Sequence, residues 1–174
     1  MSKQVRVWGR FIRIIHWYLV LAFFLNYFVL DAGSDPHQIL GYVALCAVLV
    51  RIIWGMMSKK QGSFATASLS LKAFALHFTH LKNREVPINA GHNPVGWIMI
   101  LATWTLFIGL AATGFMLEEI DYFFGNSLVE DIHSIFSDVL YGLVLLHVAA
   151  VFIVAWWGRV SLIRPMLTGW RNRK

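Results

Sequence analysis

The sequence contains little charge, because Asp, Glu, Lys and Arg together make up only 14% of its 174 residues. About a quarter of the residues are charged in an average soluble domain, and here hydrophobic residues reach 58%. The single cysteine, Cys46, excludes a disulfide and any metal site built from several cysteines, and we interpret it as a small core residue. The sequence therefore predicts one domain that is too apolar to be soluble.

Four long apolar runs stand out, and each is close to the ~20 residues that a helix needs to cross a bilayer. They do not alternate with a period of two, which excludes a closed barrel. A cleaved signal peptide is also excluded, because the first run is longer than a signal core and contains His16. The predicted fold is an all-α, integral membrane four-helix bundle in a single domain over residues 1–174. Its helices are expected at about 14–30, 37–57, 94–117 and 132–157.

The first and third connections between these helices lack Lys and Arg and carry acidic residues instead. Basic residues gather at both ends of the chain and in the second connection, so the positive-inside rule places these parts in the cytoplasm. Residues 64–82 have the spacing of an amphipathic helix on the inner membrane surface, with His77 and His80 interpreted as solvated or lipid-facing. The net charge of +6 thus indicates topology and anionic lipid rather than nucleic acid.

Four histidines lie within the predicted helices or at their ends. His133 and His147 are separated by 14 residues, so they project from one face of a helix and lie roughly 21 Å apart along its axis. His16 is expected near the inner surface of the membrane, and His37 near the outer surface. Each depth therefore offers two imidazoles from antiparallel helices: His16 with His147 inside, and His37 with His133 outside.

Two imidazoles on opposite faces of a porphyrin give a six-coordinate iron that is suited to electron transfer. Zinc needs three or four ligands at one depth, and each depth here offers two. The sequence therefore predicts two haem b groups, and the lack of a Cys-x-x-Cys-His motif excludes covalent attachment. Arg13 and Arg51 lie near the inner end, where each guanidinium either binds a haem propionate or reaches out to lipid phosphate.

Small and polar residues mark further positions of interest. Gly41 follows His37 by one turn, where a missing side chain lets a flat ligand approach the backbone. Glycines in the third helix, Gly109 and Gly114 among them, indicate close helix packing, with room for a cofactor as the second interpretation. Asn26 is expected to hydrogen-bond a neighbouring helix. His92 is interpreted as an interfacial residue, with a haem propionate or a quinone as the alternative.

The chain resembles the bacterial cytochrome b561 family, which includes the b-type subunits of nickel–iron hydrogenases. The matching residues are Arg13-x-x-His16-Trp17, His37-x-x-x-Gly41, Arg51-x-x-Trp54-Gly55, Thr113-Gly114 and His133-x13-His147. The resemblance implies a four-helix fold with two haems. It also implies that His16 and His147 ligate one haem and that His37 and His133 ligate the other, which is the pairing expected from depth.

Two haems at the two membrane faces predict a protein that carries electrons across the bacterial inner membrane. A quinone, either ubiquinone or menaquinone, is the expected partner within the membrane. The family resemblance implies a periplasmic partner such as a c-type cytochrome, a hydrogenase or a molybdoenzyme. The alternative that it implies is superoxide, which would be oxidised while the quinone is reduced. Acidic outer loops favour a basic protein over an anion. A haem-free transporter or a structural subunit is the alternative class, although no inverted repeat is evident.

Overall fold

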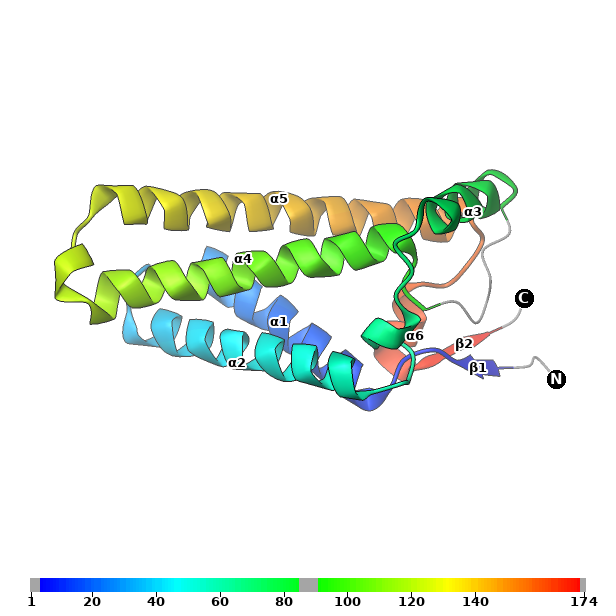
Figure 1. Cartoon of the computed structure of the whole chain (residues 1–174), viewed down its shortest axis with the longest axis horizontal. Coiled ribbons are helices and arrows are strands. Elements are labelled where there is room, and N and C mark those ends of the chain that lie inside the picture. The colour runs from blue at the N-terminus through cyan, green and yellow to red at the C-terminus, as the bar shows by residue number, and fades with distance from the viewer. Residues whose placement is uncertain (1–3, 85–90, 173–174) are drawn as a thin grey trace. The chain divides into compact units, whose positions relative to one another are not determined.

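The computed structural model describes residues 4–84 and 91–172. Its described part contains six α-helices, two short 3₁₀ helices and one pair of strands (Figure 1). In chain order these are β1 (Gln4–Arg6), α1 (Arg10–Phe28), α2 (Asp35–Met57), η1 (Phe64–Thr66), α3 (Leu71–Lys82), α4 (Pro94–Glu119), η2 (Asp121–Phe123), α5 (Ser127–Trp157), α6 (Ile163–Thr168) and β2 (Trp170–Asn172).

The four predicted spans correspond to α1, α2, α4 and α5, and the largest differences lie at their N-terminal ends. Asn93 caps α4 as expected, because its side-chain oxygen accepts a hydrogen bond from Gly96 N at 2.6 Å. At α5 the cap is Asn126, which accepts from Val129 N at 3.2 Å, so this helix begins at Ser127 rather than at 132. Helix α1 likewise begins at Arg10 instead of 14. These helices are therefore longer than the apolar runs predict, because their first turns contain polar residues.

Large apolar side chains are exposed along all four long helices, for example Phe24, Ile53, Ile98 and Phe152. Among the described residues these four helices are long and apolar enough to cross a membrane. A surface of this kind is stable in lipid and not in water, which indicates a membrane protein. Cys46 also is exposed on α2, so the interpretation of this residue as part of the core is wrong.

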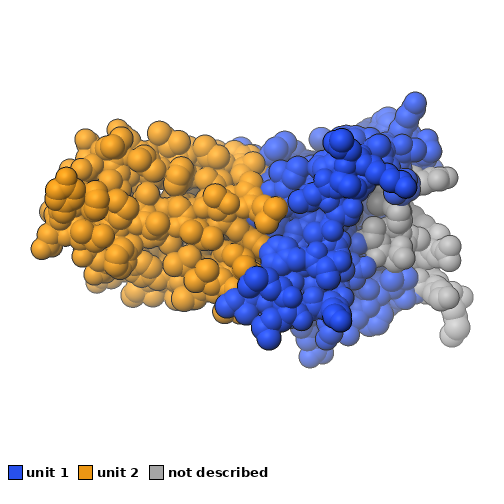
Figure 2. All heavy atoms as spheres, in the orientation of Figure 1, with its two compact units in different colours: residues 1–14, 53–100, 145–174 blue, residues 15–52, 101–144 orange. Residues whose placement is uncertain are grey.

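The chain divides into two compact units, which Figure 2 shows in different colours. Unit 1 comprises residues 1–14, 53–100 and 145–174, and unit 2 comprises residues 15–52 and 101–144. Each of the four long helices contributes a segment to both units.

In unit 1 the two ends of the described chain pair with one another. Strands β1 and β2 are antiparallel, with Val5 opposite Arg171. The Val7 and Trp8 amides both donate to the Gly169 carbonyl, at 2.9 and 3.3 Å. Gly169 ends α6 with a φ of +89°, a left-handed conformation that favours glycine. The sequence did not predict this strand pair, which adds a small sheet to an otherwise helical fold and lays the terminal segments side by side.

The core of unit 1 consists of Val7, Trp8 and Ile12, with Trp54 and Met166 packed against them. The second connection, in which the sequence predicts an amphipathic segment over residues 64–82, contains η1 and then α3. The Ser70 side chain caps the start of α3.

The far end of α3 is fastened to the end of α5. Trp157 Nε1 donates to the Leu81 carbonyl at 2.9 Å, and the Arg84 guanidinium lies 4.3 Å from the centre of the Trp157 ring. His77 and His80 are half-buried on α3. Burial, and secondly the nearby His80, lower the pKa of His77 below its usual value of 6.5.

Candidate functional site

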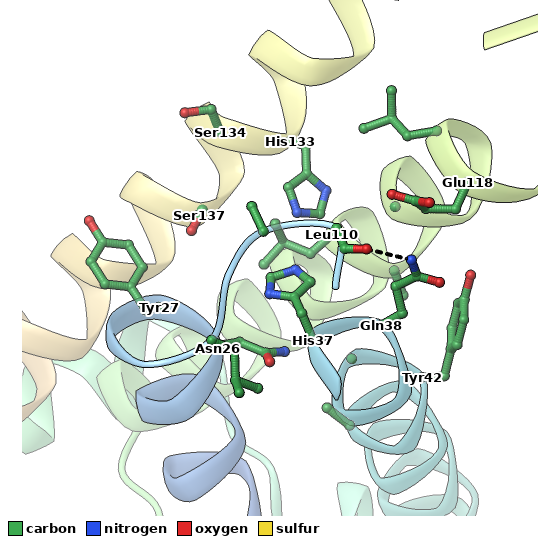
Figure 3. Close-up of a pocket in the computed structure, with 18 of the residues that line it drawn as sticks. Asn26, Tyr27, His37, Gln38, Tyr42, Leu110, Glu118, His133, Ser134 and Ser137 are labelled. Carbon is green, nitrogen blue, oxygen red and sulfur yellow. Dashed lines mark hydrogen bonds between the residues drawn. The ribbon is translucent and has the colours of Figure 1, made fainter. Parts of the chain in front are cut away.

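A cavity of about 700 Å³ lies within unit 2, among the segments of α1, α2, α4 and α5 that belong to this unit (Figure 3). Much of its wall is apolar, and cofactor pockets typically measure about 300–1,000 Å³. The apolar part of the lining includes Ala22, Phe23, Ala44, Phe107, Leu110 and Leu140.

Two of the predicted ligands, His37 and His133, face each other across this cavity (Figure 3). Their ring centres are 6.4 Å apart, and the ring planes are inclined by 50°. A metal–imidazole bond is about 2 Å long and the ring centre lies about 1 Å beyond the nitrogen, so two axial imidazoles on one metal place their centres roughly 6 Å apart. The observed spacing therefore fits two ligands of one iron.

His133 is held from behind by α4. Thr113 Oγ1 lies 2.8 Å from His133 Nδ1, and the Thr113 hydroxyl is also 2.8 Å from the Gly109 carbonyl and 3.1 Å from the Leu110 carbonyl. A Cβ on Gly114 would lie 3.6 Å from His133 Cε1, in ordinary contact. The backbone of α4 thus approaches this imidazole closely, and the Nε2 side of the ring is the side left for a ligand.

Glycines in unit 2 divide between the two interpretations made from the sequence. Gly109 serves close packing, since a Cβ there would meet Phe136 Cε2 at 2.6 Å. Gly41 and Gly114 line the cavity, and the nearest atom that a Cβ on Gly41 would meet is Asn26 Nδ2, at 3.9 Å. Room for a flat ligand thus exists beside these two glycines.

Three buried polar atoms in the cavity wall make no hydrogen bond within residues 4–84 and 91–172: His37 Nδ1, Asn26 Oδ1 and Tyr42 Oη. Buried polar groups in folded proteins nearly always have a partner, so three such atoms around one cavity need an explanation. A cofactor with polar edges gives one. The facing imidazoles, the apolar wall and these atoms together fit a haem.

Carboxylates also line the cavity, and among its described lining residues none is Lys or Arg. These acidic residues are Glu118, Glu130 and Asp138. Tyr27 donates to Asp138 at 3.1 Å and stacks on Tyr141, with ring centres 4.8 Å apart. Asp138 is not among the site residues predicted from the sequence, although an acidic residue inside an apolar helix is itself a signal of function.

The predicted inner ligands fall in different units, His16 in unit 2 and His147 in unit 1, so their pairing remains a prediction. Arg51, in unit 2, is only 4% exposed, and its guanidinium lies 5.4 Å from the centre of the Trp104 ring. Arg13, in unit 1, donates to the Leu167 carbonyl, a contact that neither interpretation of this residue included. Binding of propionates by the two arginines stays a prediction.

His92 lies within unit 1 between two indoles. Its ring centre is 4.3 Å from that of Trp8 and 5.5 Å from that of Trp97. These contacts connect the segment before α1 to the start of α4. The structure thus gives His92 a packing role in addition to the interfacial position expected from the sequence.

Four apolar helices and a haem-sized cavity with two opposed imidazoles define the class of membrane b-type cytochromes. The family model for prokaryotic cytochrome b561 matches residues 7–169, and the chain belongs to that family. Membership implies b-type haem binding and electron transfer in a membrane. No match was found among curated proteins or among solved structures.

Proposed function

We propose that this protein is a di-haem b-type cytochrome that carries electrons across the bacterial inner membrane, between a quinone pool and a periplasmic redox protein. The observation that carries the proposal is the pair His37 and His133, opposed at 6.4 Å across a cavity of about 700 Å³. Haem iron held in this way supplies one-electron chemistry by alternating between the ferric and ferrous states.

In this proposal His37 and His133 hold the outer haem, while His16 and His147 hold the inner one. Helix α5 runs without interruption from Ser127 to Trp157 and carries one ligand of each pair. Its rise over 14 residues would place the two proposed ligands on this helix, His133 and His147, roughly 20 Å apart along the helix axis. Ubiquinone or menaquinone is the partner within the membrane.

The proposed topology has both termini in the cytoplasm. Pairing of β1 with β2 supports a common side for the two ends, and their basic residues support the cytoplasmic side. The cavity near α2's first turn and α5's first turns then faces the periplasm.

A basic redox protein is the external partner that the chemistry of this end favours. Tyr122, Phe124 and Leu128 are 83%, 78% and 67% exposed, and acidic residues surround them in the sequence. Phe124 also lines the cavity, so a protein bound to this acidic and aromatic patch would be close to the proposed outer haem. The same negative charge would repel superoxide, which remains the alternative substrate.

The test of the proposal is haem content per chain, measured by the pyridine haemochrome method on purified protein. We expect two haems b in the wild type and one in each of His37→Ala, His133→Ala, His16→Ala and His147→Ala. The first two variants should lose the same haem, as judged by redox titration, and the last two the other. His80→Ala is the matched control, because His80 lies on α3 outside the cavity, and it should retain both. Zero or one haem in the wild type would contradict the proposal.

The identity of the external partner is tested by the rate at which each candidate reduces the protein. Reduction by a basic c-type cytochrome should slow with rising salt and should slow further in Asp121→Lys, whereas Lys72→Glu on α3 should not alter it. A rate with superoxide that exceeds the rate with the basic cytochrome, and that rises in Asp121→Lys, would instead establish the superoxide alternative. Oxidation of the reduced protein by a quinone in vesicles tests the membrane side.

A further inference from the structure

We infer that Thr113 is a positioning residue for the outer haem: its hydroxyl oxygen accepts the His133 Nδ1 hydrogen, which presents His133 Nε2 to the iron and makes the imidazole a stronger donor. The inference rests on the proposed function, in which His133 is a ligand. It goes beyond that function because it assigns a role to a residue that touches neither the iron nor the partner.

The direction of the hydrogen bond follows from the number of hydrogens available. A threonine hydroxyl has one hydrogen and two lone pairs. Thr113 Oγ1 lies 2.8 Å from the Gly109 carbonyl oxygen, and two oxygens this close repel each other unless a hydrogen lies between them. The hydroxyl hydrogen is therefore used within α4, shared with the Leu110 carbonyl at 3.1 Å.

A lone pair of the same oxygen then faces His133 Nδ1 at 2.8 Å. The Nδ1 atom must carry a hydrogen to bond to it, so the neutral ring has its free lone pair on Nε2, the atom that binds iron. Thr113 is only 8% exposed, so water does not compete for this bond.

The two proposed outer ligands are therefore unequal. The His133 ring has the Thr113 oxygen as a partner at Nδ1 and also a backbone hydrogen bond to Leu110, while His37 Nδ1 has no partner within residues 4–84 and 91–172. A hydrogen bond from Nδ1–H raises the basicity of a metal-bound imidazole and fixes its orientation. A more basic ligand stabilises ferric iron relative to ferrous iron, so Thr113 lowers the reduction potential of the outer haem.

The experiment is a redox titration, followed by optical and EPR spectra, of wild type, Thr113→Val and Thr113→Ser. Valine matches the shape of threonine without the oxygen, and serine retains the hydroxyl. We expect the midpoint potential of the outer haem to rise in Thr113→Val, with a changed EPR signal and about 10–100-fold weaker retention of that haem. The inner haem should not change, and Thr113→Ser should restore wild-type values.

A wild-type outer potential in Thr113→Val would overturn the role of Thr113, and so would a serine variant that behaves like valine, since packing alone would then explain both. Thr113→Ala also lacks the oxygen and serves in place of valine if that variant does not fold. His133→Ala separates the two proposals: retention of both haems there contradicts the proposed function. Loss of one haem there, with an unchanged Thr113→Val, contradicts only the role of Thr113.

Discussion

Replacement of Gly109 by alanine should weaken the packing of α4 against α5 in unit 2. A Cβ at this position would lie 2.6 Å from Phe136 Cε2 and 2.8 Å from Phe136 Cδ2, which is closer than real Cβ atoms approach such neighbours. Thr113 lies one turn along α4 from Gly109, and His133 lies three residues before Phe136 on α5. The change therefore also disturbs the helix spacing on which the bond between Thr113 and His133 depends.

The magnitude follows from two opposing terms. Alanine is more favourable than glycine inside a helix by about 0.8–1 kcal/mol. Overpacking of a well-packed contact costs about 1–3 kcal/mol, and the Phe136 ring can turn only partly aside. Gly142 on α5 is the matched control, because a Cβ there would meet nothing within 4 Å. Gly142→Ala should therefore gain the helix propensity of alanine without the cost of overpacking. The two variants should differ by about 1–3 kcal/mol in the free energy of unfolding.

The assay is thermal unfolding of the purified protein, with haem absorbance and tryptophan fluorescence recorded together. At about 2–4 °C per kcal/mol for a chain of this length, Gly109→Ala should melt roughly 2–12 °C below Gly142→Ala. It should also lose the outer haem at a lower temperature. If Gly109→Ala melts with or above Gly142→Ala, the close approach of the helices at Gly109 is not a constraint and the reasoning fails.

Two further predictions concern α3 in unit 1. Trp157→Phe removes the donor to the Leu81 carbonyl and should loosen the end of α3 by about 0.5–1.5 kcal/mol, seen as faster hydrogen exchange there. Trp156→Phe, at a residue that is 78% exposed, should leave the exchange unchanged, and equal effects of both variants would contradict the assignment. Because the folded pKa of His77 is lowered, the unfolded chain binds more protons, so stability should fall as the pH drops from about 6.5 to that lowered pKa. Unfolding measured at pH 7.5 and 5.5 should show a smaller loss in His77→Gln than in wild type, and an equal loss would refute the prediction.

Hydropathy and charge were sufficient to predict the membrane character and the four long helices. In lipid the backbone must satisfy its own hydrogen bonds, so an apolar run of about 20 residues leaves few alternatives to a helix. Polar helix ends were predicted less well, because Asn126 and other caps act through local geometry rather than through composition.

The spacing of the histidines predicted which residues share a depth, since helical rise is constant. That His37 and His133 would face each other follows from antiparallel helices, and the structure places their rings across one cavity. The matching inner pair still awaits its test by haem content.

Other features depend on residues that are distant in the sequence, and no local sequence pattern indicates these features. Pairing of β1 with β2 joins residues at opposite ends of the chain. The bond between Thr113 and His133 requires both the rotation of two helices and their approach at Gly109. Sequence alone determined that this chain is a membrane protein and predicted histidines at two depths, because lipid and helical periodicity act on each segment separately. Only the tertiary structure decided which oxygen lies behind His133 and how large a cavity lies in front of it, because both depend on how the helix faces meet.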